Sequence, residues 1–258
     1  MKAYLEAARS SGPFEGYKRH LAALLALQPG ERIVDIGCGL GDDLRAAAEA
    51  VGGNGRAVGI ERDEETLKLL GTLAWPPQAR VVAGEAEALP LADASFDAAR
   101  MDRVLHMLAD PMQALSEARR VLASHGRLLL AEPLWRTLRL SGARLSSDAV
   151  ARQIARDTAE APGAAQFDPA GLARAAGFEV QSEEAMQVRF TDAAEARRLL
   201  HLDRSAFALR LRKEIEAEAL DAWHSAMRSD AADGSFEARL DGLVLDLRRS
   251  RSANRRQS

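Results

Sequence analysis

The segment IVDIGCGLGD, residues 33–42, carries the strongest local pattern in this chain. Its first residues, Ile33, Val34 and Ile36, are apolar and β-branched, which is typical of a buried strand. Glycines at 37, 39 and 41 follow, so the backbone can adopt turns that are closed to other residues and a ligand can approach it closely. From Leu44 the apolar residues take helical spacing. The segment therefore predicts a strand, a glycine turn and a helix whose first N–H groups are unpaired.

The residues around this turn indicate which ligand it binds. Dinucleotide-binding turns have a third glycine where this chain has Asp42, and the carboxylates of Asp42 and Asp43 would repel a pyrophosphate. Asp35, just before the turn, can accept a hydrogen bond from an ammonium group. A second strand at 57–60 ends in Glu61, an acid that can accept both hydroxyls of a ribose. We therefore expect a nucleoside with an amino-acid tail. A nicotinamide-dependent oxidoreductase, which shares the turn and the ribose acid, is the alternative.

Strand and helix patterns then alternate along the chain. Further strands are expected at 80–83, 96–101, 127–131, 178–186 and 236–247, although the charged Arg100 makes 96–101 a poor strand. Asp63, Asp110 and Asp168 are expected to begin helices. This alternation predicts an α/β fold: a Rossmann-like, doubly wound, mostly parallel seven-stranded sheet with a helical cap formed by insertions. In such sheets ligands bind beyond the carboxyl ends of the strands.

The same patterns predict how the chain is divided. We expect a lead helix region at 1–30, a cofactor-binding core at 31–133, a cap insertion without strands at 134–165, core again at 166–190, a helical cap at 191–234, a last core strand at 235–248 and a disordered tail at 249–258. Within the helical cap, apolar residues spaced four apart predict one buried helical stripe: Leu211, Ile215, Ala219, Trp223 and Met227.

Composition limits the classes of partner. The 258 residues carry a net charge of −3, which disfavours nucleic acid and anionic membranes as partners. The one cysteine, Cys38, is consistent with a reducing compartment, and we expect it to pack rather than to act as a nucleophile. No early apolar run suggests a leader or a membrane span, so we expect a cytoplasmic protein, monomeric or homodimeric, that holds no metal.

Five motifs, in order, resemble those of class I S-adenosylmethionine-dependent methyltransferases. They are VDIGCGLG (34–41), GIERD (59–63), AGEAEALPLADASFD (83–97), MDRVLHML (101–108) and GRLLLAEP (126–133). The set looks most like the small-molecule branch found in ubiquinone and menaquinone synthesis and in natural-product tailoring. The resemblance implies S-adenosylmethionine as cofactor, S-adenosylhomocysteine as its product and a small-molecule acceptor.

The resemblance also implies site residues. Cofactor contacts are expected at Asp35, Gly37, Cys38, Gly39, Gly41, Glu61, Arg62, Gly84, Glu85, Ala86, Met101 and Tyr17. In the resembled family the acid at the place of Glu85 meets the adenine amino group, and the N–H of the next residue meets a ring nitrogen. Trp135, Tyr4 and His106 are the expected acceptor contacts.

Methyl transfer from a sulfonium needs little more than orientation. The acceptor atom must lie about 3–3.5 Å from the methyl carbon and in line with the bond that breaks. A base can help where the acceptor carries a proton, and His106 is the first candidate because imidazole titrates near neutral pH. Glu132, at the end of the fifth strand, is the second. A non-catalytic S-adenosylmethionine-binding protein is a further alternative to the enzyme.

Overall fold

The computed structural model describes residues 11–145, 148–159 and 167–250. The predicted acceptor contact Tyr4, parts of the predicted cap insertion (146–147 and 160–165) and most of the predicted tail (251–258) lie outside the described residues. None of the helices within the described ranges is both long enough and apolar enough to cross a membrane.

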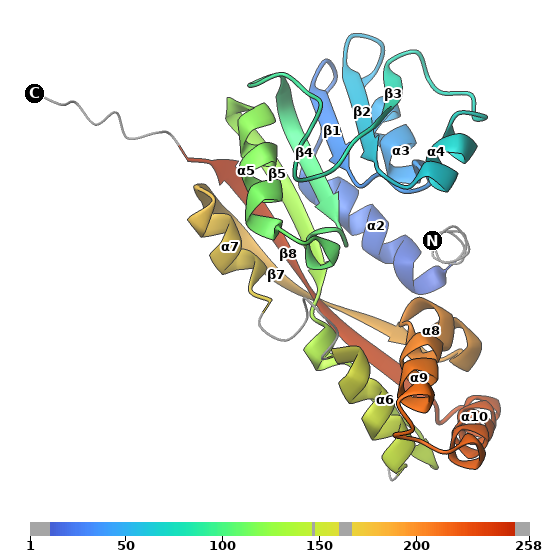
Figure 1. The fold of residues 1–258 in the computed structure, drawn as a ribbon. Coiled ribbons are helices and arrows are strands. Elements are labelled where there is room, and N and C mark those ends of the chain that lie inside the picture. The colour runs from blue at the N-terminus through green and yellow to red at the C-terminus, as the bar shows by residue number, and fades with distance from the viewer. Residues whose placement is uncertain (1–10, 146–147, 160–166, 251–258) are drawn as a thin grey trace, which may run out of the picture. The chain divides into compact units, whose positions relative to one another are not determined.

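A mostly parallel sheet organises the described chain (Figure 1). Its strands are β1 (Arg32–Ile36), β2 (Arg56–Glu61), β3 (Ala79–Ala83), β4 (Phe96–Asp102), β5 (Leu122–Pro133), β6 (Arg139–Ser141), β7 (Phe178–Phe190) and β8 (Glu237–Arg249). The order is β3-β2-β1-β4-β5-β8-β6, and β7 pairs with β8. Strands β1 to β5 pair parallel with one another: β1 with β2 and β4, β2 with β3, and β4 with β5. The predicted Rossmann-like α/β fold is confirmed.

One strand was not expected. The sequence predicts seven strands and none in 134–165, yet β6 lies there and pairs antiparallel with β8 through Arg139 and Arg239. It is three residues long, too short to leave an alternating apolar pattern in the sequence. The described sheet therefore has eight strands rather than seven.

Helices connect and flank the strands. They are α2 (Gly12–Leu25), α3 (Asp42–Val51), α4 (Glu64–Leu70), η1 (Leu105–Met107), α5 (Pro111–Val121), η2 (Trp135–Thr137), α6 (Ala149–Ala159), α7 (Pro169–Ala175), α8 (Ala193–Leu199), α9 (Leu202–Leu211) and α10 (Ala217–Ala232). The three predicted helix starts are confirmed, because the carboxylates of Asp63, Asp110 and Asp168 each accept a hydrogen bond from a backbone N–H three residues on.

The chain forms two compact units. The sheet unit comprises Lys18–Glu132, Asp168–Glu184 and Val244–Ser258; the helical unit comprises Met1–Tyr17, Pro133–Phe167 and Ala185–Leu243. In the sheet unit, α3 packs on β1 and β2 through Leu44, Ala48 and Val51, and α5 lies beside α7 (Figure 1). The domain boundaries expected from the sequence stay a prediction.

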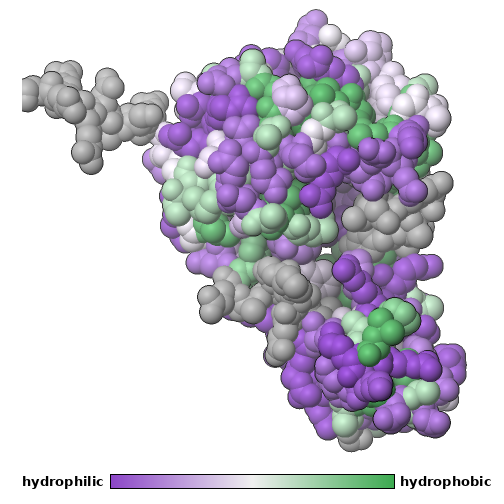
Figure 2. All heavy atoms as spheres, in the orientation of Figure 1, coloured by the Kyte–Doolittle hydropathy of each residue, from purple (hydrophilic) through white to green (hydrophobic). Residues whose placement is uncertain are grey.

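The helical unit departs from the single buried stripe predicted for it. Its 192–231 block is three helices, and α9 ends at Leu211, so the predicted stripe is interrupted. Ile215, Trp223 and Met227 are buried as expected, but Leu211 is 68% exposed and Phe207, one turn earlier, is 62% exposed. Figure 2 shows hydrophobic surface over α9 among mostly hydrophilic atoms.

Candidate cofactor site

The glycine turn after β1 has the backbone that its sequence predicts. Gly37, Gly39 and Gly41 all have positive φ, at 75°, 53° and 76°, a region that favours glycine. The neighbours also leave no room for side chains. A Cβ on Gly37 would lie 2.5 Å from Cγ2 of Val104, and one on Gly41 would overlap the ring of Trp75. Both conformation and space therefore require glycine in this turn.

Cys38 lies inside the same turn with its side chain turned into the protein. Its thiol is buried against Gly59, where an added Cβ would come within 2.7 Å of the sulfur. Burial raises the pKa of the Cys38 thiol above its ordinary value, with the carboxylates of Asp35 and Glu61 adding to the effect. The thiolate is therefore disfavoured at neutral pH, in keeping with the packing role expected for this residue.

Glu61 ties the end of β2 to the glycine turn. One of its carboxylate oxygens accepts a hydrogen bond from the N–H of Gly39 at 3.0 Å. The other accepts from the N–H groups of Arg62 and Asp63, at 2.9 and 2.8 Å. These bonds place a carboxylate beside the turn, where it can meet hydroxyl groups of a ligand.

A buried charge cluster supports the turn from β4. Arg100 is only 8% exposed, and its guanidinium lies 3.3 Å from Asp35, 3.1 Å from Asp43 and 2.8 Å from Asp102. Lys18 binds Asp43 at 2.9 Å. From the sequence, the charged Arg100 was expected to disfavour a strand at 96–101. The structure shows that the strand forms, because three carboxylates surround the buried guanidinium.

Asp35 has one carboxylate oxygen that the cluster leaves unpaired. Its Oδ1 meets Arg100, whereas its buried Oδ2 has no hydrogen-bond partner within the described part of the chain. Burial raises the pKa of Asp35 to about 6; Arg100 opposes that rise and Asp43 adds to it. An unpaired buried carboxylate oxygen next to a ligand-accessible turn suits a cationic group such as an ammonium.

The same cluster changes one inference from the sequence. Burial alone would raise the pKa of Asp43, but Arg100 and Lys18 outweigh it and hold that pKa below its ordinary value. Asp43 is therefore ionised but neutralised by its partners, and its predicted repulsion of a pyrophosphate is weaker than the sequence suggested. A lone arginine inside a central strand was the available signal, because buried charges need partners.

His106, which follows β4, and Glu132, near the end of β5, form a hydrogen-bonded pair. Nδ1 of His106 lies 2.6 Å from a carboxylate oxygen of Glu132. The Glu132 side chain is fully buried and also accepts from the backbone N–H groups of Val104, Leu105 and His106. Because this carboxylate is buried and already accepts several hydrogen bonds, it does not suit the direct base role predicted for Glu132. Its position suits a residue that orients the imidazole of His106.

The remaining cofactor candidates of the sheet unit lie at the same end of the strands. Arg62 and Glu85, after β2 and β3, form an exposed ion pair at 3.5 Å. A Cβ on Gly84 would lie 2.7 Å from Cδ of Pro90, so this turn also requires a small residue. Ala86 and Met101 are both buried. Because parallel strands end together, the structure gathers these residues beside the glycine turn and Glu61.

Two further candidates belong to the helical unit. Tyr17 packs edge-on against Phe14, with ring centroids 6.1 Å apart. Trp135, in η2, lies beside the ring of His201 at 5.9 Å, with the planes tilted by 45°. The ligand contacts expected for Tyr17 and Trp135 stay predictions.

Comparison with known families accounts for this arrangement. Residues 34–130 match the family described as a methyltransferase domain. Over this segment the chain is similar to methyltransferase domains. The resemblance to class I S-adenosylmethionine-dependent methyltransferases of the small-molecule branch is confirmed, and the cofactor of that family is S-adenosylmethionine.

Three similar proteins place the methyltransferase domain in context. An uncharacterized 37.1 kDa protein in transposon TN4556 of Streptomyces fradiae is 36% identical over 203 residues, covering 78% of this chain and 59% of that protein. A demethylmenaquinone methyltransferase of Lysinibacillus sphaericus is 31% identical over 118 residues, covering 45% and 50%. A putative methyltransferase structure from Bacillus halodurans has a TM-score of 0.59 at 19% identity, covering 91% and 99%, and shows the shared fold. The chain spans about half to three fifths of the curated relatives' length.

Proposed function

We propose that this protein transfers a methyl group from S-adenosylmethionine to a small-molecule acceptor. The observation that carries the proposal is the glycine turn flanked by two acids, one of which, Asp35, keeps a buried carboxylate oxygen unpaired. A cationic amino-acid tail fits this arrangement. The sequence match of residues 34–130 to a methyltransferase domain supports the same reading.

The chain's own residues bind and orient the reactants. Asp35 would accept from the ammonium group of the cofactor, and Glu61 from the ribose hydroxyls. Glu85 and the N–H of Ala86 would meet the adenine. When bound, the cofactor supplies an activated methyl group on a sulfonium, so the protein need not protonate the leaving group. Binding therefore does most of the catalytic work, by orientation and by excluding water.

His106 would accept the acceptor's proton where the acceptor has one. Glu132 holds Nδ1 of the imidazole, which fixes the ring, and Nε2 is the atom we propose for proton transfer. Glu132 is thus a positioning residue. A hydroxylated aromatic or quinol-like acceptor fits such a base, and a demethylmenaquinone methyltransferase is among the similar proteins.

Calorimetry with S-adenosylhomocysteine tests the cofactor assignment. We expect saturable binding with a dissociation constant in the micromolar range, strongly weakened by Asp35→Asn or Glu61→Gln, while NAD gives no heat. Candidate phenols and quinols are then screened for release of S-adenosylhomocysteine. Folded protein that binds NAD and not S-adenosylhomocysteine would support the oxidoreductase instead. Binding without turnover on any acceptor would support a non-catalytic binding protein.

Removal of the imidazole tests the base. For His106→Ala we expect kcat to fall about 10²- to 10⁴-fold with unchanged affinity for S-adenosylhomocysteine. The loss should shrink at high pH, where the acceptor ionises without help. His20→Ala is the matched control, because this exposed histidine pairs only with Glu184 among the contacts described. A pH-independent loss would show that His106 only shapes the site.

A further inference from the structure

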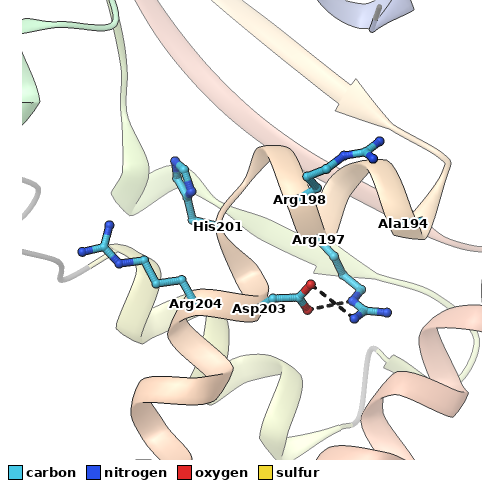
Figure 3. Close-up of a pocket in the computed structure, with 6 residues that line it drawn as sticks. All are labelled: Ala194, Arg197, Arg198, His201, Asp203 and Arg204. Carbon is cyan, nitrogen blue, oxygen red and sulfur yellow. Dashed lines mark hydrogen bonds and ion pairs between the residues drawn. The ribbon is translucent and has the colours of Figure 1, made fainter. Parts of the chain in front are cut away.

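A hollow opens between α8 and α9 of the helical unit, and none of the residues that line it is among those assigned to the cofactor. Its volume is about 450 Å³, within the range of small-molecule pockets. The residues that line it are Ala194, Arg197, Arg198, His201, Asp203 and Arg204 (Figure 3). Three arginines thus surround one cavity in a chain whose net charge is negative.

The acid in this hollow is already engaged. Nε and a terminal nitrogen of Arg197 donate to the two carboxylate oxygens of Asp203, at 2.8 and 3.2 Å. Figure 3 shows this pair below the turn between the helices. Asp203 is therefore neutralised by Arg197 and leaves the other cations of the hollow unbalanced.

Arg198 and Arg204 are the unbalanced cations. Both are exposed, and neither makes an ion pair with another residue in the described part of the chain. Figure 3 shows the Arg204 side chain extending to one side of the His201 turn and the Arg198 side chain extending to the other, the side on which Arg197 also lies. Both guanidinium groups and the imidazole line the same hollow, and each offers N–H donors.

The turn that presents these groups is held in an unusual backbone conformation. His201 has φ 56°, in the left-handed region that non-glycine residues seldom adopt, and its ring lies against Trp135. Such conformations persist where the surroundings fix them, and they gather at ligand sites. Exposed arginines are usually only solvated, but here they border a cavity beside a fixed imidazole.

We propose that this hollow binds a small molecule through a carboxylate or phosphate group. Arginine suits such a group because its planar guanidinium can donate two parallel hydrogen bonds to one oxyanion. Arg198 and Arg204 bind the anion, and Arg197 stays with Asp203. The proposal does not depend on methyl transfer, since it rests on residues of the helical unit alone.

Titration of the full-length protein tests the site. The probes are inorganic phosphate, phenyl phosphate, benzoate and the neutral phenol, at constant ionic strength set with chloride. We expect saturable binding of one or more anions and none of phenol; the comparison of phenyl phosphate with benzoate separates the two oxyanions. Arg198→Ala and Arg204→Ala should each weaken binding about tenfold, the scale of one charge-assisted hydrogen bond.

Arg210→Ala is the matched control, because Arg210 is an exposed arginine of α9 outside the hollow. Equal weakening by Arg210→Ala would show general charge attraction and overturn the site, as would equal binding of phenol or no anion binding at all. Binding of S-adenosylhomocysteine is measured on every variant. A variant that still binds S-adenosylhomocysteine is folded. If the unaltered protein does not bind S-adenosylhomocysteine, that result counts against the proposed function and not against the anion site.

Discussion

At the scale of single residues, Asp35 couples protonation to ligand binding. Its carboxyl is buried and its pKa is raised to about 6, above the ordinary value of 3.8. Between these two pH values the folded protein holds a proton that the unfolded chain has lost, so this group makes the free energy of unfolding fall as pH rises from about 4 to 6. The affinity for a ligand with an ammonium group should instead rise over this pH range, because the ammonium group needs the ionised carboxylate.

The affinity for S-adenosylhomocysteine should therefore depend on pH. We expect it to be constant above pH 7 and about tenfold weaker at pH 5, where only about a tenth of Asp35 is ionised. Calorimetry between pH 5 and 8 measures this. Asp35→Asn should bind weakly with a flat profile, and Glu49→Gln, an exposed acid on α3, should behave as the unaltered chain does. An unchanged affinity at pH 5 would contradict the role of Asp35.

Some of these site residues could be predicted from the sequence, and others could not. The glycines and Glu61 follow from local pattern, because a turn that excludes Cβ atoms and an acid at a strand end are visible within a few residues. The cluster around Arg100 is not local. Its partners come from β1, α3 and β4, and Lys18 joins from α2. Only the sheet order, which sets β1 beside β4, brings them together.

At the scale of elements, one ion pair fastens the start of β1 to the start of β4. Asp97 accepts from the backbone N–H of Arg32 at 3.0 Å and from its guanidinium at 2.9 and 2.7 Å. The hydrogen bonds from the Arg32 side chain lower the pKa of Asp97 to about 2, although partial burial opposes them. The stabilisation is present above the ordinary pKa and is lost as pH falls toward 2.

Asp97→Asn should lower the free energy of unfolding by about 2 kcal/mol at pH 7, the equivalent of the shift in pKa. Urea unfolding followed by circular dichroism measures the change. The control is Asp93→Asn, which breaks the exposed ion pair with Arg120 and should cost less than about 1 kcal/mol. An equal decrease in the free energy of unfolding for the two variants would show that the Arg32–Asp97 ion pair stabilises the fold no more than an exposed ion pair does.

The helical block shows where periodicity fails at this scale. The spacing of Leu211, Ile215 and Ala219 continues a helical stripe, yet Lys213 has φ 58° and the chain turns there. No glycine or proline marks the break, so the apolar spacing predicts one helix where two exist. The length of β7 was likewise underestimated, because the strand runs to Phe190, beyond the end predicted at 186.

At the scale of the whole molecule, the fold class was predictable because strand and helix alternate in sequence. Apolar strands separated by helices allow few arrangements, and the parallel doubly wound sheet is the commonest. The division into two compact units was not predictable, because β7 and β8 each contribute residues to both. Contiguous ranges cannot describe units that share strands.

Cofactor binding should also be measurable as thermal stability of the full-length chain. At a concentration of 100 times its dissociation constant, a ligand that binds only the folded state adds about 2.7 kcal/mol. For S-adenosylhomocysteine this should raise Tm by about 5 °C or more, while NAD should leave Tm unchanged. Differential scanning fluorimetry gives both values. A shift with NAD alone would favour the oxidoreductase.

The enclosed thiol of Cys38 has a practical consequence. It is the only sulfhydryl in the sequence, and both burial and its raised pKa suppress attack on maleimides. A cysteine introduced on the surface would thus be the single reactive handle for a fluorophore or spin label. Pairs of such labels, one in each compact unit, could report the distance between the units in solution.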